Sequence, residues 1–399
     1  MNDSAPVIVH VVYRFAVGGL ENGLVNLVNH LPRDAWRHAI VALTDIDAAF
    51  ARRIERRDVE LIALGKGPGH ALPFYPRLVR LFRSLKPAIV HTRNLAALEV
   101  VPAAWLAGVA GRLHGEHGRD ALDPDGTNIR RRRIRRLFRP FVSRYVAVAP
   151  DLAEYLIGPI GIPAERVDLI VNGVDTARFS PSKPRVPIPG CPFVDPGMRL
   201  VGTVGRLDPV KAQVHLARAF SMLIQRRPEL RDVLRLVIVG EGSERAEVTR
   251  VLNDAGLLDR AWLPGERDDV ANVLRGLDVF VLPSLAEGVS NTVLEAMATG
   301  LPVVATAVGA NPYLVDDGAS GRIVPAGDPV AIANALEGYV NDPGSAAAHG
   351  EAGRQLATQR FSLDRMVDRY HRLYLDLATR SAAGRRMHAA NGPERHAPH

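Results

Sequence analysis

The stretch from Leu277 to Thr306 reads LDVFVLPSLAEGVSNTVLEAMATGLPVVAT, and it predicts a strand, a loop, a helix and a second strand. Both strand segments are short and apolar, and Gly300 and Pro302 end the helix between them. Ser290 or Asn291 can cap that helix. Two parallel strands joined by a helix form a βαβ unit. The loop before the helix is therefore expected at the carboxyl edge of a parallel sheet.

The loop and the helix place two glutamates where a phosphorylated ligand would meet them. The first N–H groups of a helix lack intrahelical partners and carry the positive end of its dipole, so they attract a diphosphate. Glu287 precedes the helix and Glu295 lies one turn inside it. Carboxylates repel phosphate but accept hydrogen bonds from hydroxyls, which a sugar and a ribose would supply. The alternative is that both glutamates are solvated surface charges.

Length and composition favour two globular domains. The 399 residues are too many for one hydrophobic core, and 47% of them are hydrophobic and 23% charged. Cys191 is the only cysteine, so we expect no internal disulfide and a reducing, cytoplasmic compartment. We expect no secretory signal at the polar start of the sequence. The longest apolar run, residues 95–110, contains Glu99 and Pro102 and is too short to span a bilayer.

Strand-like segments alternate with helix-like ones in both halves of the chain, which is typical of parallel sheets covered by helices on both faces. In the first half we expect strands at 7–13, 39–43, 59–64, 88–92, 111–116, 145–148 and 167–170. In the second half we expect them at 200–204, 234–239, 261–263, 279–282 and 303–306. Between the halves, six prolines favour an extended connector.

These patterns predict five parts. They are an N-terminal Rossmann-like domain at 1–180, a proline-rich linker at 181–198, a second Rossmann-like domain at 199–360, a C-terminal helix at 361–378 and a tail at 379–399. The helix carries an apolar stripe that must pack somewhere, and the N-terminal domain is one candidate. The tail is polar and basic, so we expect it to be disordered.

The positive charge of the chain is concentrated in one segment. The formal net charge is +7, and subtracting the eight arginines of residues 128–144, which include no acid, leaves −1. The arginines are Arg130, Arg131, Arg132, Arg133, Arg135, Arg136, Arg139 and Arg144. Apolar residues between them predict an amphipathic helix, which either contacts an anionic membrane surface or is a solvated helix face. No nucleic-acid module accompanies the charge, so nucleic acid is not an expected partner.

Two features of the first half are candidate ligand contacts. Gly18 and Gly19 follow the first strand, where they would let a ligand approach the backbone as a helix begins. His117 follows the strand at 111–116, and a histidine at the end of a parallel strand can point into the crevice beside the sheet. A glycine pair is also a common turn, and most histidines at such positions bind nothing.

The second half opens with two cations. Arg206 and Lys211 lie in the loop after its first strand. An arginine fork and a lysine point charge together suit a diphosphate. Lys211 is one of only four lysines among fifty basic residues, so a lysine at this position favours a specific role over a general surface charge. The alternative is a solvated pair of loop charges.

Several short motifs carry a family resemblance. They are GR at 205–206 followed by Lys211, LPGER at 263–267, VLPS at 281–284, EG at 287–288, EAMA at 295–298 and GLPVVAT at 300–306, with NGVD at 172–175, FSP at 179–181 and VAVA at 146–149. Together they resemble the retaining glycosyltransferases of family 4. The resemblance implies an α/β structure of the GT-B type, in which two Rossmann-like domains face each other across a cleft. HVVYRF at 10–15 and GGLENG at 18–23 further resemble sugar transferases of bacterial exosortase and exopolysaccharide systems.

The resemblance implies transfer of a hexose-type sugar, with retention, from a nucleotide-diphosphate donor to a saccharide or lipid-linked saccharide. No metal and no cofactor other than the donor substrate are implied. The implied catalytic residues are Glu287, His117, Lys211 and Arg206. The implied donor-binding residues are Gly18, Gly19, Arg206, Lys211, Gly265, Arg267, Glu287, Gly288, Asn291, Thr292 and Glu295.

Among these, Arg206 and Lys211 would bind the diphosphate, Glu287 the sugar and Glu295 the ribose. Two residues depart from the family pattern, because Ala310 and Tyr313 stand where many relatives have glycine and glutamate. Other functions stay open at this point. A nucleotide-sugar epimerase or a sugar phosphorylase would use the same fold, and a non-catalytic nucleotide-sugar-binding scaffold would use the same contacts.

Overall fold

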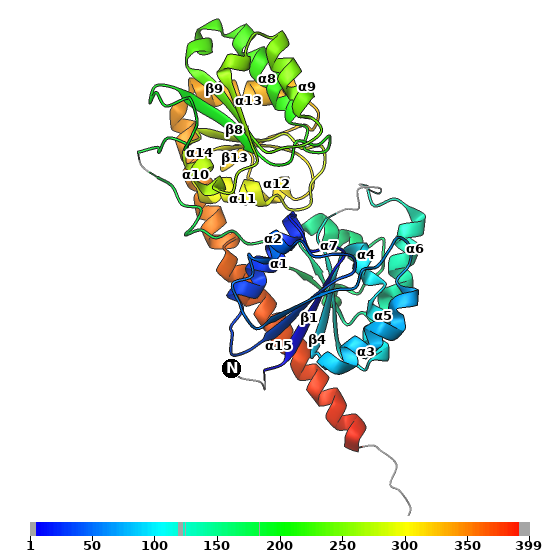
Figure 1. The fold of residues 1–399 in the computed structure, drawn as a ribbon. Coiled ribbons are helices and arrows are strands. Elements are labelled where there is room, and N and C mark those ends of the chain that lie inside the picture. The colour runs from blue at the N-terminus through cyan, green and yellow to red at the C-terminus, as the bar shows by residue number, and fades with distance from the viewer. Residues whose placement is uncertain (1–4, 119–122, 124, 183, 391–399) are drawn as a thin grey trace, which may run out of the picture. The chain divides into compact units, whose positions relative to one another are not determined.

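The computed structural model describes residues 5–118, 123, 125–182 and 184–390 (Figure 1). It divides into two compact units, and we describe each by itself. Unit 1 comprises Met1–Val171 and Met366–His399, and unit 2 comprises Asn172–Arg365. Each unit contains one parallel sheet with helices on both faces, so the expected pair of Rossmann-like domains is confirmed.

Unit 1 is built on a seven-stranded sheet in the order β3-β2-β1-β4-β5-β6-β7. The strands are β1 (Val7–Val12), β2 (Arg37–Ala42), β3 (Val59–Ala63), β4 (Ile89–Arg93), β5 (Gly111–Glu116), β6 (Arg144–Ala147) and β7 (Val167–Leu169). The helices are α1 (Gly19–His30), α2 (Ala48–Ala51), η1 (Leu72–Phe74), α3 (Tyr75–Leu85), α4 (Asn94–Leu98), α5 (Val101–Leu106), α6 (Ile129–Phe138), η2 (Arg139–Phe141), α7 (Pro150–Ile157), η3 (Ala164–Arg166) and most of α15 (Leu363–Ala390).

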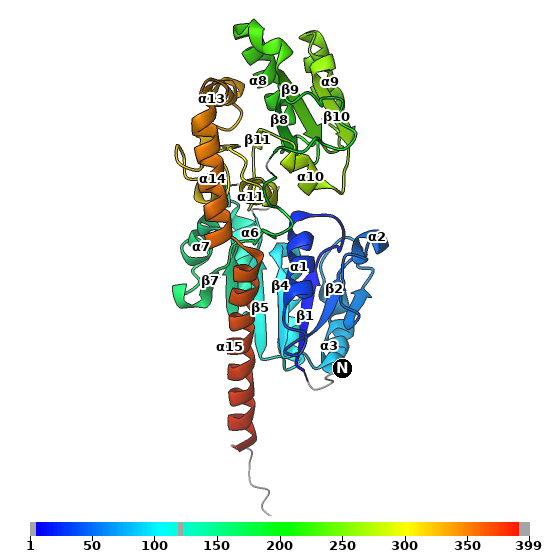
Figure 2. The ribbon, with the colours of Figure 1, turned by 90° about the vertical axis from the view of Figure 1, so that its left-hand side faces the viewer.

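The two faces of this sheet have different cover. Val9 and Val90 share one apolar cluster with α3 and α5, whereas Val12 and Ile40 share another with α1 and α2. Successive strand residues point to opposite faces, so the even-numbered residues of β1 face α1. Helix α15 runs along the sheet of unit 1 (Figure 2). Tyr374 of α15 is fully buried, and its hydroxyl is hydrogen-bonded to Nδ1 of His91 at 2.8 Å. The last helix of the chain thus completes the first domain.

Unit 2 is built on a six-stranded parallel sheet in the order β10-β9-β8-β11-β12-β13. The strands are β8 (Arg199–Val204), β9 (Leu234–Val239), β10 (Ala261–Gly265), β11 (Val279–Leu282), β12 (Val303–Thr306) and β13 (Gly321–Val324). The helices are α8 (Gln213–Arg226), η4 (Pro228–Asp232), α9 (Arg245–Asp254), η5 (Leu258–Arg260), α10 (Val270–Arg275), α11 (Asn291–Ala298), α12 (Asn311–Leu314), α13 (Pro329–Asn341) and α14 (Pro343–Arg360). One large apolar cluster joins α8, α9 and α13 to the sheet.

The βαβ unit expected between residues 277 and 306 is present. β11 and β12 pair in parallel, with Phe280 opposite Val303, and α11 connects them. The N-cap is Ser290, whose hydroxyl accepts from the N–H of Val293. Gly300 ends the segment at a φ of +78°, a conformation that glycine adopts without strain. β13 was not expected, because a four-residue strand with glycine and arginine in it has no clear apolar pattern.

The division between the units differs from the predicted one. Asn172 already belongs to unit 2, and the proline-rich segment 181–198 lies within that unit. Its side chains are docked: Arg185 donates to the Asp278 carboxylate, and a methyl group on Gly276 would meet Cγ1 of Ile188 at 2.3 Å. The interpretation of this segment as an inter-domain linker is therefore wrong. Proline density indicates extended backbone but does not indicate whether that backbone is packed.

The end of the C-terminal helix is also later than expected. α15 continues to Ala390, past the predicted end at residue 378. Its alanine-rich and arginine-rich continuation has high helix propensity, and Arg380 pairs with Asp376 one turn earlier at 2.9 Å. Residues 391–399 of the predicted tail lie outside the described part of the chain.

Candidate active site

The candidate site of unit 2 lies where its sheet changes direction. β8 and β11 are neighbours at the centre of the sheet, and the chain continues from β8 to one side and from β11 to the other. In open α/β sheets, ligands bind beside the carboxyl ends of the strands at this switch point. The loops that leave β8 and β11 carry Lys211 and Glu287, and the N–H of Leu285 joins the two loops by donating to the carbonyl of Val210.

Lys211 and Glu287 form an ion pair at this point. Nζ of Lys211 lies 2.5 Å from Oε1 of Glu287, and the two side chains are 23% and 7% exposed. A pair this close and this protected from water is held more firmly than an exposed surface pair. From the sequence we expected both residues in the same site, but we did not predict a direct contact between them.

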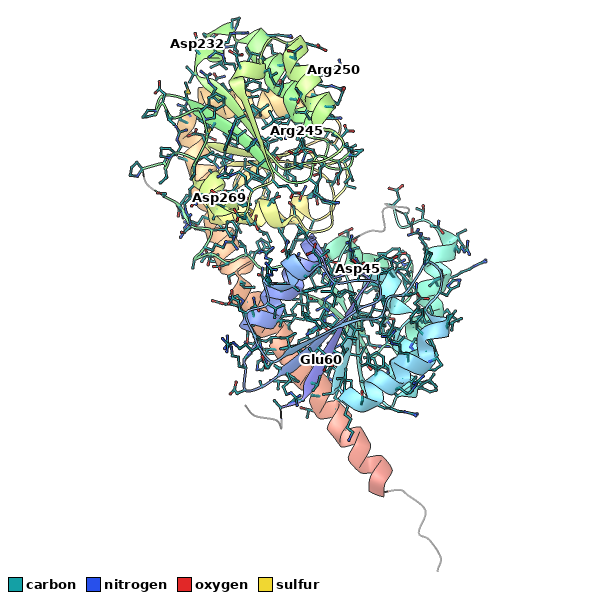
Figure 3. The ribbon with its side chains drawn as sticks, viewed as in Figure 1. Asp45, Glu60, Asp232, Arg245, Arg250 and Asp269 are labelled. Carbon is teal, nitrogen blue, oxygen red and sulfur yellow. The ribbon has the colours of Figure 1, made fainter. Side chains whose placement is uncertain are left out.

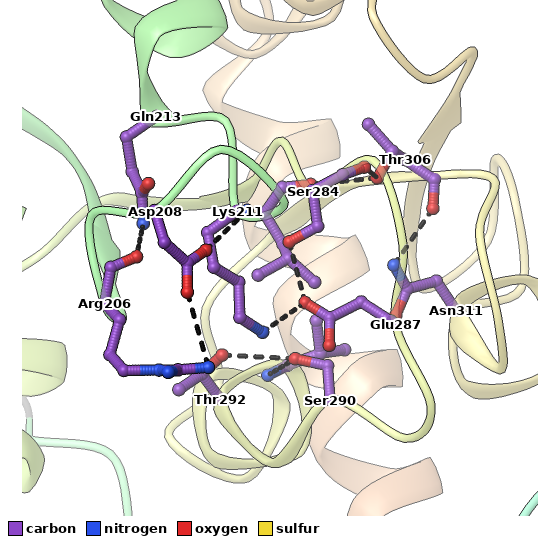
Figure 4. A network of polar contacts seen from close by, with 12 residues as sticks. Arg206, Asp208, Lys211, Gln213, Ser284, Glu287, Ser290, Thr292, Thr306 and Asn311 are labelled. Carbon is purple, nitrogen blue, oxygen red and sulfur yellow. Dashed lines mark hydrogen bonds and ion pairs between the residues drawn. The ribbon is translucent and has the colours of Figure 1, made fainter. Parts of the chain in front are cut away.

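A chain of hydrogen bonds supports Glu287 (Figure 4). The hydroxyl of Ser284 donates to Oε1 of Glu287 at 2.7 Å. The hydroxyl of Thr306 donates to the carbonyl of Ser284 at 2.6 Å, and the amide of Asn311 donates to the carbonyl of Thr306 at 3.0 Å. The loop after β11, the end of β12 and the start of α12 thereby fix the carboxylate. Its Oε1 already accepts hydrogen bonds from Ser284 and Lys211.

Arg206 lies at the exposed side of the site. Its side chain is 73% exposed, and its guanidinium lies 3.3 Å from the carboxylate of Asp208. Asp208 also accepts from the N–H of Lys211 at 3.1 Å, so it orders the loop that carries both cations. A methyl group on Gly240 would lie 2.0 Å from the carbonyl oxygen of Gly205, so glycine is needed for the loop to approach β9.

The N-terminus of α11 adjoins the same loop. Asn291 is its first residue, and its side-chain oxygen accepts from the amide of Asn172 at 2.9 Å. The hydroxyl of Thr292 lies 3.1 Å from that of Ser290. Glu295 is one turn further along and is partly exposed. The first turn of α11 therefore leaves backbone N–H groups at the carboxyl edge of the sheet, as expected from the sequence.

The segment after β12 fixes the backbone of the loop that carries Glu287. The N–H of Ala310 donates to the carbonyl of Gly288 at 2.9 Å. Gly309 has a φ of +52°, and a methyl group there would lie 2.3 Å from the carbonyl oxygen of Glu287. Of the two departures from the family pattern, Ala310 belongs to this contact, whereas Tyr313 packs against Phe361 with ring centroids 5.9 Å apart.

Gly265 and Arg267 lie at the end of β10, on the outer strand of the sheet. The carbonyl of Gly265 accepts from the N–H of Gly240 at 2.8 Å. Arg267 is bound to Asp269, which Figure 3 labels, at 2.7 Å, and its guanidinium lies 5.4 Å from the centre of the Trp262 ring. Arg267 is thus held within its own loop, and its expected role in donor binding stays a prediction.

The other expected residues belong to unit 1. Gly18 is the N-cap of α1, and Gly19 begins that helix. The glycine pair thus opens a helix, as expected. A methyl group on Gly18 would lie 2.2 Å from the carboxylate of Glu21, which folds back over the start of the helix.

His117 is folded back onto its own strand. Its Nε2 lies 2.8 Å from the position of a methyl group on Gly115, and that atom has no hydrogen-bond partner within the described residues. Burial lowers the pKa of His117 to about 3, and the charge of Arg93 adds to the shift. The ring is therefore neutral at neutral pH, and its expected catalytic role stays a prediction.

The arginine-rich segment forms α6, but its arginines are not equivalent. Arg135 is only 5% exposed and binds the Glu116 carboxylate at 2.6 Å, so its expected contact with a membrane is wrong. Arg132, Arg136 and Arg139 donate to the backbone carbonyls of Gly126, Pro159 and Gly161. Arg130 and Arg133 are exposed.

Sequence reasoning missed several residues that the structure brings to these edges. Ser284 and Asp208 orient Glu287 and Lys211, and both lie inside motifs that were noticed for other residues. In unit 1, Glu21, Arg93 and Glu116 line a cavity. The signal that could have identified this cavity from the sequence was the presence of charged residues at the ends of β4 and β5.

Two searches gave negative results over the described residues. No group of three or more histidine, cysteine, aspartate or glutamate side chains there is arranged to hold a metal ion. None of the helices in that part of the chain combines the length and the apolar character needed to cross a bilayer. The metal independence expected from the resemblance is not tested by these observations.

Family models match both units. Residues 17–178 match the model described as Glycosyltransferase Family 4, and residues 198–342 match the model described as Glycosyl transferases group 1. The chain belongs to the glycosyltransferases built from these two domains. The family expected from the motifs is thereby confirmed, whereas the association with exosortase systems stays a prediction.

Curated relatives of this glycosyltransferase include enzymes with different substrates. D-inositol 3-phosphate glycosyltransferase 2 of Catenulispora acidiphila is 36% identical over 52% of this chain and 50% of its own length. The lipopolysaccharide core biosynthesis mannosyltransferase of Rhizobium meliloti is 32% identical over 49% and 57%. An Escherichia coli UDP-Gal:alpha-D-GlcNAc-diphosphoundecaprenol alpha-1,3-galactosyltransferase is 28% identical over 75% and 78%. The chain spans about half the length of the first of these relatives.

Solved structures agree on the fold. Anabaena Alr3699/HepE in complex with UDP is 22% identical, with a TM-score of 0.78 over 93% of this chain and 100% of that one. A glycosyltransferase from Rickettsia africae is 19% identical, with a TM-score of 0.77 over 94% and 99%. At these identities the likeness shows the GT-B fold and nothing finer.

Proposed function

We propose that this glycosyltransferase moves a hexose-type sugar, with retention of configuration, from a nucleoside diphosphate to a saccharide or lipid-linked saccharide. The observation that carries the proposal is the Lys211–Glu287 pair, 2.5 Å apart at the switch point of the unit 2 sheet. A cation there binds a diphosphate, and the adjoining carboxylate accepts the hydroxyls of the sugar attached to it.

The proposed chemistry follows from where charge develops. Breaking the bond between sugar and phosphate leaves negative charge on the diphosphate, which Lys211, Arg206 and the first N–H groups of α11 would stabilise. These groups supply enough positive charge for us to expect no metal requirement. Glu287 would hold the sugar and Glu295 the ribose, while Asn291 and Thr292 would present the start of α11 to the phosphates.

The donor is tested by thermal unfolding with UDP, GDP, ADP and their sugars, in the presence and absence of a chelator. A ligand that binds only the folded protein adds about 2.7 kcal/mol of stability at one hundred times its Kd. We expect one nucleotide to raise Tm in the wild type and to lose this effect in Lys211→Ala. No shift with any nucleotide would contradict the proposal.

The reaction is tested by product analysis. Radiolabelled donor with a membrane extract as acceptor should give a labelled saccharide or lipid-linked saccharide in which the anomeric configuration of the donor is kept. An epimerised nucleotide sugar in the absence of acceptor would indicate an epimerase. Consumption of free phosphate would indicate a phosphorylase, and binding without any product would indicate a scaffold.

For a lipid-linked acceptor we propose a peripheral contact with anionic membranes through the outer side of α6. Arg130 and Arg133 are exposed there, and so are Ile129 and Leu137, at 65% and 67%. Exposed apolar side chains beside arginines suit the interface between headgroups and acyl chains, where each basic residue contributes about 1 kcal/mol.

Liposome flotation tests this contact. The double variant Arg130→Gln with Arg133→Gln should bind anionic vesicles less than the wild type does. Arg218→Gln with Arg250→Gln removes the same charge from α8 and α9 and should bind them as the wild type does. Equal binding of the wild type to anionic and neutral vesicles would contradict the proposal.

A further inference from the structure

Unit 1 contains a cavity that the proposed donor contacts do not use. Its volume is about 290 Å³, and it lies beside the carboxyl ends of β1, β4 and β5. β1 and β4 are the neighbours at which this sheet changes direction, so the cavity occupies its switch point. Ligand pockets start at roughly 300 Å³, so this one is of a size for a single sugar unit.

Arg93, at the end of β4, supplies a buried positive charge to this cavity. It is only 2% exposed and lines the cavity wall. Its guanidinium donates to Nδ1 of His10 at 3.3 Å and to Nδ1 of His91 at 3.2 Å. Burial lowers the pKa of both histidines well below the ordinary value, and the charge of Arg93 lowers them further, so both are neutral acceptors.

The carboxylates of the cavity do not neutralise Arg93. Glu116 is bound to Arg135 at 2.6 Å, so these two charges compensate each other. Glu21 is close enough for the charge of Arg93 to influence its pKa, which burial raises, but the two form no ion pair. Over the residues that the structure covers, no carboxylate lies within ion-pair distance of the guanidinium. A buried charge without a counter-charge costs several kcal/mol, which an anionic ligand would offset.

The geometry points to a saccharide unit with one acidic group, a phosphate or a carboxylate, as the ligand of this cavity. The acidic group pairs with Arg93, whose planar fork matches both kinds of oxyanion. Hydroxyls of the same unit donate to Glu21, which also lines the cavity. That this unit belongs to the acceptor rests on the proposed function, whereas its binding to unit 1 does not.

Calorimetric titration of the full chain tests this inference with two matched pairs of probes. Glucose 6-phosphate is compared with glucose, and methyl β-glucuronide with methyl β-glucoside. Each titration is repeated in Lys211→Ala, which removes a phosphate contact of unit 2. We expect at least one acidic probe to bind about 10-fold or more tightly than its neutral counterpart in both proteins, as for loss of a charged hydrogen bond. The pair that shows the difference identifies phosphate or carboxylate.

Variants of Arg93 locate the binding. Arg93→Gln should abolish the preference for the acidic probe, whereas Arg80→Gln, which removes an arginine from the exposed side of α3, should retain it. If Arg93→Gln does not fold, Arg93→Lys keeps the charge without the fork and should bind the acidic probe more weakly than the wild type does. Circular dichroism confirms that each variant is folded.

Three results would overturn the inference. They are equal affinity for acidic and neutral probes, an unchanged preference in a folded Arg93→Gln protein, and a preference that disappears in Lys211→Ala. Failure of the proposed function looks different, because no nucleotide would then bind while the preference of unit 1 for an acidic sugar would persist.

Discussion

Lys211 and Glu287 reach each other from the loops after the two central strands of unit 2, with Nζ 2.5 Å from Oε1. A phosphate that binds Lys211 must either share the lysine with Glu287 or displace the Glu287 carboxylate from it. Ser284 also donates to Glu287, so the carboxylate keeps one partner when the lysine turns to a ligand. The pair is therefore a preformed contact, and the Ser284 hydrogen bond lowers the cost of opening it to a donor.

Lys211→Ala should lower kcat by about 10²-fold or more, as for loss of one strong donor at a developing oxyanion. Steady-state kinetics with the identified donor measure this. Arg218→Ala removes an exposed cation of α8 and should leave kcat unchanged. Near-normal turnover of Lys211→Ala would remove the residue from the site.

Arg206→Ala should weaken donor binding while leaving the stability of the protein nearly unchanged. Its side chain is 73% exposed and its ion pair with Asp208 spans 3.3 Å, so its removal should change the free energy of unfolding by less than about 0.5 kcal/mol. Donor affinity should fall by about 10-fold, since the exposed guanidinium can exchange its contact with Asp208 for phosphate oxygens. Urea unfolding and nucleotide titration check both values. A large loss of stability with unchanged affinity would assign Arg206 a structural role.

Arg135→Ala should destabilise the protein by roughly 3–5 kcal/mol, because it leaves the Glu116 carboxylate buried without its counter-charge. Burial alone would raise the pKa of Glu116, but His114, whose Nε2 lies 3.5 Å from the carboxylate, and the charge of Arg135 lower it to about 2. Arg133→Ala, two residues earlier and exposed, should cost less than about 0.5 kcal/mol. Similar unfolding midpoints for both variants would contradict the structural role of Arg135.

Stability should fall as pH decreases from 6.5 to 5. Burial lowers the pKa of His38 to about 3 and those of His10 and His91 well below the ordinary value. In this window the unfolded chain binds protons that the folded protein does not, so acid favours unfolding by at most about 1.4 kcal/mol per pH unit for each histidine. Urea midpoints at pH 7 and pH 5 measure the effect.

A control for this experiment is His70→Gln, because the His70 side chain is 81% exposed. That variant should show the same pH dependence as the wild type. Carboxylates with ordinary pKa values titrate mainly below pH 5, so they contribute little between the two conditions. Equal midpoints at both pH values would mean that His10, His38 and His91 are protonated in the folded protein without cost.

Gly309→Ala should impair both folding and donor binding. At a φ of +52° an alanine is strained, and its methyl group would lie 2.3 Å from the carbonyl oxygen of Glu287. We expect a loss of about 1–3 kcal/mol in stability and weaker nucleotide binding, because the Glu287 loop must move. Gly338→Ala is the matched control: it lies within α13 with open space around it and should stabilise by up to about 1 kcal/mol. Unchanged nucleotide affinity in Gly309→Ala would contradict the coupling.

The sequence predicted the elements of unit 2 well because their signals are local. An apolar strand, a serine cap, a glycine stop and a proline follow one another from residue 279 to 302, and each acts on its immediate neighbours. Lys211 and Glu287 were expected in one site because parallel strands carry their following loops to the same edge. Their direct contact depends on the order of β8 and β11, which the local pattern does not specify.

The cavity of unit 1 was missed because its burial depends on a distant segment. His91 and Arg93 look like polar residues at the end of a strand, and they are buried by α15, whose Tyr374 follows His91 by 283 positions. In the sequence, Arg135 looks the same as its neighbours in a run of arginines. A shift of one position along the helix would bring a different side chain to face Glu116. Packed polar groups of this kind give no periodic signal.

The return of the chain to unit 1 at Met366 sets an order on biosynthesis. A ribosome adding about 5–20 residues per second needs on the order of ten to forty seconds to pass from the last strand of unit 1 to α15. Throughout that interval the face with His10 and His91 is not yet covered by Tyr374 of α15. The nascent first domain is therefore a species that chaperones and proteases can engage, although the mature protein hides that face completely.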